Sequence, residues 1–266
     1  MAIILITGAT GGIGAKLSEM LAKEKNSLIL LATKIDSLEK LSTELKETYN
    51  ISVTTIQCDV SNYDDLKNKL SRLTEIDAVI NCAGVAGPTG PIEDNNMAEW
   101  NKAIQVNLLG TVHVCNILIP ILKNSKKSRR GKIINFAGGG SAYARKFHTA
   151  YACSKTAVVR FTETIAQEHP ELDINVIAPG AHKTKMWDEQ LHESEPEKWG
   201  DMDRLKDLIV YLSCEKSDNL SGKFIHIYDD WDKKDFRLAD SDLYTLRRID
   251  DRFIQKFVDK QHENKN

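Results

Sequence analysis

Tyr151 and Lys155, four residues apart in the segment Tyr-Ala-Cys-Ser-Lys, are the pair in this chain best suited to acid–base chemistry. Side chains at this spacing lie one above the other on a helix face. A free phenol has a pKa of about 10 and is a poor acid or base at neutral pH. A cation about 4 Å away at an effective dielectric of about 20 favours the phenolate by roughly 4 kcal/mol, or about three pKa units. The spacing therefore predicts a phenol with a pKa of about 7 that exchanges a proton with a carbonyl or alcohol oxygen.

A glycine-rich segment near the start of the chain predicts a phosphate-binding turn. It reads Gly8-Ala9-Thr10-Gly11-Gly12-Ile13-Gly14. The unbroken apolar run 2–7 before it is typical of a buried parallel strand, and residues 15–21 after it have helical spacing. Glycines let the backbone approach a pyrophosphate, and the helix N-terminus offers free N–H groups and partial positive charge. Strand, turn and helix in this order predict a dinucleotide site.

The elements that must position these residues alternate along the chain. Further strands are expected at 28–32, 53–57, 78–82, 132–136, 174–178 and 224–227, and helices at 38–49, 64–73, 97–123, 150–168 and 204–212. The fold class is therefore α/β, with a single Rossmann-like doubly wound sheet of about seven parallel strands and helices on both faces. We expect one dinucleotide-binding domain over residues 1–230 and a C-terminal extension over 231–266. Apolar spacing predicts a helix at 243–257 in that extension, which either docks on the same or a neighbouring subunit or brings Arg247 and Arg248 to the substrate.

Composition narrows the class of protein further. A chain of 266 residues with 41% hydrophobic residues and a net charge of -2 favours one domain and gives no reason to expect nucleic acid as a partner. Five scattered cysteines with no C-x-x-C pair are expected to be reduced, and no signal peptide or apolar run of about 20 residues is apparent, which predicts a cytoplasmic protein without a membrane span. The histidines lack metal-binding spacing, so no metal site is expected.

Several segments together resemble the short-chain dehydrogenase/reductase family over residues 2–227. The matching motifs are Thr7-Gly8-x-x-x-Gly12-x-Gly14, Asp59-Val60, Asn81-Cys82-Ala83-Gly84, the Tyr151 and Lys155 pair, and Pro179-Gly180-x-x-x-Thr184. The resemblance implies that Tyr151 and Lys155 are catalytic, and that Asn107 supports a proton relay. It also implies a nicotinamide cofactor held by Gly8, Thr10, Gly11, Gly12, Ile13, Gly14, Thr33, Lys34, Asp59, Val60, Asn81, Ala83, Gly84, Tyr151, Lys155, Pro179, Gly180 and Thr184.

One position departs from the family pattern. The family carries a catalytic serine just after the fifth strand, where this chain has Gly138 in the run Gly138-Gly139-Gly140-Ser141. The loss of one such hydrogen-bond donor costs about 10²–10³ in rate. Either Ser141 turns inward and acts as the fourth catalytic residue, or a backbone N–H or Thr149 takes its place, or Ser141 only begins the next loop.

Residues near the motifs suggest which cofactor and substrate are used. The end of the second strand carries Thr33 and Lys34 and no acid that would repel a 2′-phosphate, so NADP is favoured over NAD. Basic residues gather around the site and favour an anionic substrate, such as a phosphorylated or nucleotide-linked sugar. These residues are Arg145, Lys146, His148, His182, Lys183 and Lys185. The triple-glycine turn and the tail resemble a bacterial branch found with surface-sugar biosynthesis.

The expected activity is hydride transfer between NADP(H) and a carbonyl or secondary alcohol. Two alternatives stay open, a non-redox sugar epimerase or dehydratase with tightly bound cofactor and an NAD(P)-sensing binding protein. The resemblance also implies a homodimer or homotetramer, built from the helices that carry Asn107 and Tyr151. The apolar residues expected to fill the sheet face and this interface are Ala157, Val158, Phe161, Ile165, Trp100, Ile104, Val112 and Cys115.

Overall fold

The apolar strand segments pair into one parallel sheet. The computed structural model describes residues 1–124, 129–188, 195–233 and 243–248. Within them the strands are β1 (Ile3–Thr7), β2 (Ser27–Ala32), β3 (Val53–Gln57), β4 (Ala78–Asn81), β5 (Lys132–Phe136), β6 (Asp173–Ala178) and β7 (Phe224–His226). They lie in the order β3-β2-β1-β4-β5-β6-β7, and every neighbouring pair is parallel. This is the doubly wound sheet that the sequence predicts.

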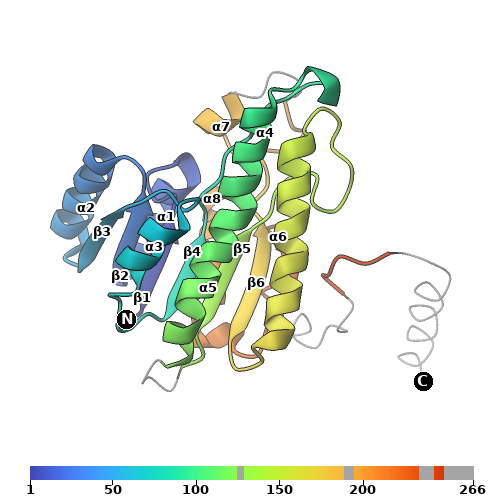
Figure 1. Cartoon of the computed structure of the whole chain (residues 1–266). Helices are drawn as coiled ribbons and strands as arrows, with labels where there is room; N and C mark the ends of the chain where they lie inside the picture. The colour runs from blue at the N-terminus through green and yellow to red at the C-terminus, as the bar shows by residue number, and fades with distance from the viewer. Residues whose placement is uncertain (125–128, 189–194, 234–242, 249–266) are drawn as a thin grey trace, which may run out of the picture.

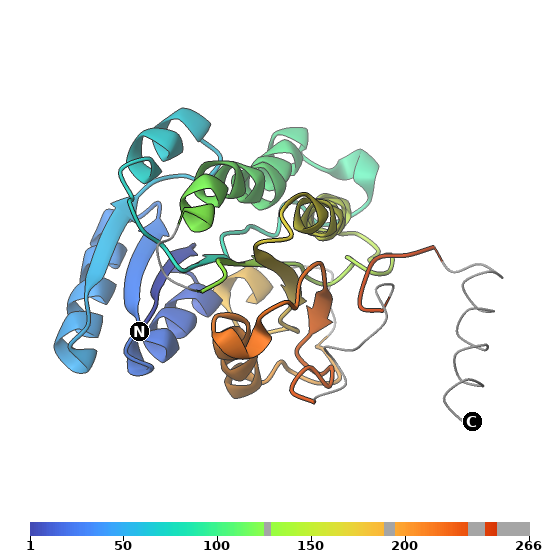
Figure 2. The same cartoon turned by 90° about the horizontal axis from the view of Figure 1, so that it is seen from below.

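Helices cover both faces of the sheet (Figures 1 and 2). They are α1 (Gly12–Lys23), α2 (Ile35–Tyr49), α3 (Tyr63–Leu70), α4 (Met97–Ile104), α5 (Gly110–Lys123), α6 (Thr149–Glu168), α7 (Lys185–Asp188) and α8 (Met202–Leu212), with 3₁₀ turns η1 (Ile92–Asp94) and η3 (Glu215–Ser217) and a π-helical turn η2 (Gln105–Leu109). Helices α1, α2 and α8 share one apolar cluster, and α3 and α5 another. The sheet is the middle layer of three.

Side chains alternate between the two faces of each strand, which divides the core into these two apolar clusters, one on each face of the sheet. In β1, Ile4 and Ile6 join the cluster under α1, α2 and α8, whereas Leu5 joins the cluster under α3 and α5. All three are at most 1% exposed. Both faces of the strand are therefore buried, which explains its unbroken apolar sequence.

Strand β1 lies at the centre of the sheet, with β2 on one side and β4 on the other. The chain leaves β1 toward one half of the sheet and returns through β4 to the other half. The loops that follow these two strands diverge, and this point is where doubly wound sheets open a ligand crevice at the carboxyl ends of their strands.

The segment Met97–Lys123 forms one continuous helical run through α4, η2 and α5. It is long and apolar enough to cross a membrane by length and composition, so the expectation that no run approaches that length is wrong. Half of its most apolar window is buried inside the protein, against the sheet and its neighbours. Core packing therefore accounts for its apolar character. The π-helical turn in its middle, which the sequence did not predict, contains Asn107, and such turns often mark functional sites.

The part of the C-terminal extension that the structure describes, residues 243–248, is not helical. The expected helix at 243–257 is therefore wrong over these residues, and its remainder lies outside the described ones. The Phe224 N–H on β7 donates to the Tyr244 carbonyl at 2.6 Å. Leu246 packs on a cluster that includes Val158 and Val159 of α6. The segment, drawn in red in Figure 1, thus contacts both β7 and α6.

Glu163 on α6 is the polar anchor of this segment. Its side chain is 5% exposed and accepts from the Leu246 N–H, and it pairs with the guanidinium groups of Arg160 and Arg247. A buried carboxylate without such partners would be costly. Arg247 is therefore engaged with α6 rather than with the crevice.

We expect Leu246→Ala to lower the free energy of unfolding by about 1–2 kcal/mol, because a half-buried leucine loses part of the contacts that a core leucine would lose. Urea denaturation measures the change. The matched control is Ile92→Ala, which truncates a side chain that is 50% exposed and should change stability by about 0.5 kcal/mol or less. Equal effects of the two substitutions would contradict the packing described for this segment.

Candidate active site

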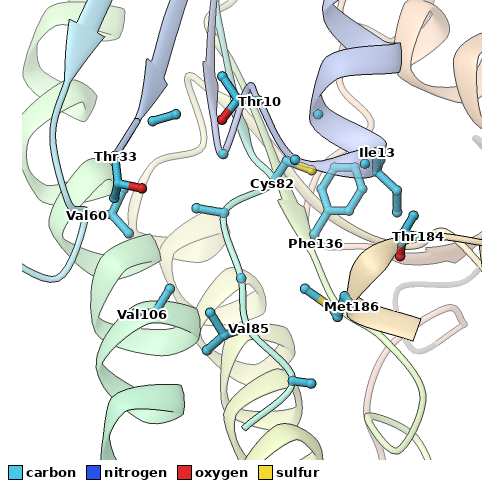
Figure 3. A pocket seen from close by; sticks show the side chains of 18 of the residues that line it. Thr10, Ile13, Thr33, Val60, Cys82, Val85, Val106, Phe136, Thr184 and Met186 are labelled. Carbon is cyan, nitrogen blue, oxygen red and sulfur yellow. The ribbon is translucent and has the colours of Figure 1, made fainter. Parts of the chain in front are cut away.

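A cleft of about 470 Å³ opens at the carboxyl ends of the central strands. Figure 3 shows residues of its wall from the β1–α1 turn, β2, the loops after β3 and β4, and α7. Most of the residues expected to bind cofactor line it. These are Gly8, Thr10, Gly11, Gly12, Ile13, Gly14, Thr33, Asp59, Val60, Ala83, Gly84, Tyr151, Lys155, Pro179 and Thr184. Lys34, Asn81 and Gly180 are not among the lining residues.

The glycine turn is shaped by close backbone approaches. Gly8 has a φ of +65°, and a Cβ there would lie 2.7 Å from the Ala83 Cα. A Cβ on Gly14 would lie 2.2 Å from the Gly8 carbonyl oxygen. Gly11 precedes α1 and offers no side-chain cap, so the first N–H groups of this helix have no side-chain acceptor there. The turn therefore fits a pyrophosphate, whose oxygens would accept from these groups.

Four further residues expected to hold the cofactor follow β2 and β3, namely Thr33, Lys34, Asp59 and Val60. Thr33 follows β2 and lines the cleft, whereas Lys34 is the exposed residue that precedes α2. Asp59 accepts from the N–H and the hydroxyl of Ser61 at 2.9 and 2.7 Å, which fixes its carboxylate. Val60 packs on Gly110, where a Cβ would lie 2.5 Å from the Val60 Cγ2.

Lys155 and Asn107 both lie close to Gly84. A Cβ on Gly84 would be 3.2 Å from the Asn107 Oδ1 and 3.5 Å from the Lys155 Nζ. Asn107 accepts from the Val85 N–H at 2.8 Å and donates to the Val85 carbonyl at 2.9 Å and the Ser154 Oγ at 3.0 Å. It thereby fixes the loop after β4 to α6, at the level of Lys155.

The Lys155 ammonium is buried and donates to the Phe136 carbonyl at 2.9 Å. Burial lowers the pKa of Lys155 to about 8. Its Nζ lies 5.9 Å from the centroid of the Tyr151 ring.

The environment of Tyr151 differs from the expectation. Burial raises the pKa of its phenol above the usual value, Arg145 lowers it and Cys82 raises it. The sequence predicts that Lys155 lowers the pKa of the Tyr151 phenol to about 7. That expectation is wrong for the protein without bound cofactor. The expectation counted one cation in contact and left out the cost of burying a phenolate, which here is the largest effect.

The Ser141 hydroxyl is hydrogen-bonded to the backbone of Gly138. Its Oγ donates to the Gly138 carbonyl at 2.8 Å and accepts from the Gly138 N–H at 3.2 Å. Thr149 accepts from the Trp100 indole N–H at 3.1 Å. A Cβ on Gly138 would lie 2.4 Å from the Tyr151 hydroxyl oxygen. The phenol itself thus occupies the space that a side chain at position 138 would need.

Asn81 belongs to a buried polar chain rather than to the cleft wall. It donates to the Asn135 Oδ1 at 2.8 Å, and Asn135 donates to the Thr162 hydroxyl at 2.8 Å. These bonds link β4 and β5 to α6. The sequence did not single out Asn135. The signal that could have identified it is an amide residue between isoleucine and phenylalanine in an apolar strand, because a polar side chain buried there needs hydrogen-bond partners.

The basic residues near the site are distributed unevenly. Lys185 lines the cleft, and so does Lys102, which the sequence did not single out. Lys183 lies over the Trp199 ring and Lys146 over the Phe147 ring. His182 is buried with its Nε2 2.7 Å from the Pro179 carbonyl, and burial lowers its pKa. Among the described residues no group of three or more histidine, cysteine or acidic side chains could hold a metal ion.

Comparison with known proteins gives the class of this fold and site. The model of the short chain dehydrogenase family matches residues 2–195. The chain is 33% identical over 190 residues to the 11-beta-hydroxysteroid dehydrogenase-like protein 3 of Arabidopsis thaliana, across 69% of this chain and 60% of the plant protein. The chain therefore belongs to the short-chain dehydrogenase/reductase family, whose members are NAD(P)-dependent oxidoreductases.

Two solved structures share the fold with different cofactors. An NAD⁺-bound xylitol dehydrogenase is 23% identical with a TM-score of 0.75, and the match covers 85% of this chain and 97% of that one. A short-chain dehydrogenase from Shigella flexneri 2a str. 301, complexed with NADP, is 24% identical with a TM-score of 0.76, over 86% and 97%. At this identity the likeness establishes the fold and leaves cofactor preference to the residues of the cleft.

We expect Gly138→Ala to destabilise the protein by about 1–3 kcal/mol, because the new Cβ and the Tyr151 ring compete for the same space. The same change in a Tyr151→Ala background should cost much less, a coupling that denaturant unfolding of the four proteins measures. Gly139→Ala is the matched control, since the nearest atom to a Cβ there is 3.5 Å away. Additive effects of Gly138→Ala and Tyr151→Ala would contradict the close contact.

Proposed function

We propose that this chain transfers hydride reversibly between NADP(H) and a carbonyl or secondary alcohol, with Tyr151 as the group that transfers the proton. The observation that carries the proposal is the joint lining of one cleft by the glycine turn, Tyr151 and Lys155. The turn fits the pyrophosphate of a dinucleotide, and the phenol lies where a small substrate would enter the same cleft. When bound, the nicotinamide supplies or accepts the hydride.

In the direction of reduction, the Tyr151 hydroxyl donates its proton to the substrate oxygen, and in oxidation the phenolate takes it back. Lys155, with its ammonium fixed by the Phe136 carbonyl, holds the nicotinamide ribose. Asn107 fixes Val85 and Ser154 behind Lys155 and is proposed to support the water relay that returns the proton to Tyr151. Ser141 has no part in this scheme, because its hydroxyl is bonded to Gly138.

The residues that follow β2 support the proposal that the chain prefers NADP to NAD as its cofactor. Thr33 lines the cleft there, and no acidic side chain follows β2 before Asp36, within α2. Lys34 lies outside the wall, so its long side chain would have to turn toward a 2′-phosphate. The absence of a carboxylate at the end of β2 leaves room for that phosphate without repulsion.

An anionic substrate, such as a phosphorylated or nucleotide-linked sugar, is the proposed substrate class. Lys102 and Lys185 support it, since both line the cleft and come from different elements. Of the basic residues expected around the site, Lys146 and Lys183 contact aromatic rings and His182 is buried.

Tyr151→Phe should reduce turnover about 10²–10⁴-fold, because the ring still packs and only the transferable proton is lost. The measurement is NADPH oxidation with a panel of aldehydes, ketones and sugar phosphates that carry a carbonyl group, together with the Kd for NADPH, which should stay near the wild-type value. Tyr63→Phe is the control, since that hydroxyl bonds Asn116 away from the cleft. A Phe variant with wild-type turnover would overturn the proton-transfer role. Conversion of substrate without net NADPH oxidation would favour an epimerase or dehydratase instead.

Thr33→Asp should weaken NADPH binding at least about tenfold relative to NADH, because a carboxylate at this position repels a 2′-phosphate and accepts from a ribose hydroxyl. Fluorescence titration with both nucleotides measures the ratio. Thr54→Asp introduces the same charge at an exposed position of β3 and should leave the ratio unchanged. A wild-type chain that binds NADH more tightly than NADPH would contradict the proposed preference.

We propose that the chain is a homo-oligomer, as is common in this family. Val158, Ile165 and Cys115 are already buried in the core, so they are not free for a subunit contact. Ile104, Val112 and Ala157 are only partly covered and remain available on α4, α5 and α6. In a homodimer with a two-fold axis, the same residues of both subunits meet at the contact.

Val112→Lys should therefore lower the molar mass that light scattering measures, because a lysine ammonium would be buried at the centre of the contact. Thr43→Lys on α2, at the opposite face of the sheet, is the control and should leave the mass unchanged. A wild-type chain that is monomeric at micromolar concentration would contradict the proposed assembly.

A further inference from the structure

The three glycines after β5 each face a particular side chain. A Cβ on Gly138 would lie 2.4 Å from the Tyr151 hydroxyl oxygen, and one on Gly139 would lie 3.5 Å from the Arg145 Nη1. Gly140 has a φ of +88°, and a Cβ there would lie 2.8 Å from the Ala152 Cβ and 3.0 Å from the Arg145 Cβ. The bare backbone of this turn is thus the surface on which Tyr151 and Arg145 lie.

Arg145, from the loop between this turn and α6, approaches the ring of Tyr151. Its guanidinium carbon is 5.7 Å from the ring centroid, within the range of a cation–π contact. Lys155 lies at 5.9 Å from the same centroid and comes from the helix of Tyr151 itself. The buried phenol therefore has two cations at similar distances, from two different elements.

We propose that Arg145 stabilises the ionised form of the Tyr151 phenol, beside a turn in which a serine side chain at position 138 has no room. The inference rests on the proposed function, in which Tyr151 gives its proton to the substrate oxygen and is left as a phenolate. Arg145 acts through Tyr151 and is a positioning residue. The glycine turn and Arg145 are in contact, because a Cβ on Gly140 would lie 3.0 Å from the Arg145 Cβ.

No other group described beside Tyr151 carries a negative charge that would offset the charge of Arg145. The other groups beside it are Lys155 from α6 and Cys82 from the loop after β4. Burial raises the pKa of the Cys82 thiol to about 12, so it is uncharged at neutral pH. The Lys155 ammonium is directed to the Phe136 carbonyl. Burial raises the pKa of Tyr151, and Arg145 is the neighbouring cation that lowers it.

The test follows the ionisation of Tyr151 by NMR, on the full chain labelled with ¹³Cζ-tyrosine and loaded with NADP⁺. The Tyr151 signal is assigned by its loss in Tyr151→Phe. Arg145→Met should raise the midpoint of this titration by at least about half a pH unit. Arg145→Lys, which keeps a positive charge, should raise it less. Lys67→Met is the matched control, since it removes a cation 5.6 Å from the ring of Tyr63, outside the cleft.

The midpoint of Tyr151 should be unchanged in Lys67→Met, and the Kd for NADP⁺ unchanged in all three variants, because Arg145 is not among the residues that line the cleft. Equal midpoints in the wild-type chain and Arg145→Met would overturn the inference, as would a wild-type Tyr151 that stays protonated up to the pH of unfolding. The titration needs no substrate. A shifted midpoint in a chain whose Tyr151→Phe variant turns over normally would refute the proposed function alone and leave the charge contact intact.

Discussion

The close approach of two backbone segments at the centre of the sheet determines where the cleft lies. The turn after β1 passes so near the loop after β4 that a Cβ on Gly8 would lie 2.7 Å from the Ala83 Cα. The Thr7 hydroxyl accepts from the Ala83 N–H at 3.1 Å and fixes this approach. Because β1 and β4 are neighbours, the two segments close the floor of the crevice, and the N-terminus of α1 is aimed into it.

Buried hydrogen bonds connect the helix that carries Tyr151 and Lys155 to the same part of the cleft. Asn107 connects Val85, two residues beyond Ala83, to Ser154 on α6. Asn81, Asn135 and Thr162 make a parallel connection through the sheet. Such bonds are strong in a dry interior and costly when incomplete. They hold the helix that carries Tyr151 and Lys155 at a fixed distance from the nucleotide turn, a requirement of any reaction that joins hydride and proton transfer.

The sequence predicts the order of strands and helices along the chain, the glycine turn and the placement of Tyr151 and Lys155 in one cleft, because each depends on local spacing and on the geometry of parallel sheets. The pKa that the sequence predicts for the Tyr151 phenol is wrong. Segments distant in the sequence bury the phenol, and one of them supplies the Phe136 carbonyl to which Lys155 is bonded. The substitute suggested at Ser141 depends on the path of a flexible turn, which spacing does not define. The π-helical turn at Asn107 and the irregular backbone at 243–248 are likewise set by contacts with other elements, whereas helical periodicity alone favoured regular helices at both places.

The segment at 243–248 also changes the outer boundary of the sheet. Strand β7 comes last in the strand order, and an unpaired strand edge is a template on which other chains can add strands. Here the Tyr244 carbonyl accepts from the Phe224 N–H, and the Lys223 ammonium donates to the Leu243 carbonyl at 3.0 Å. The chain thus occupies part of its own open edge with a short, irregular piece that cannot propagate a ladder. Residues 243–244 therefore cover part of the β7 edge, where another strand could otherwise add.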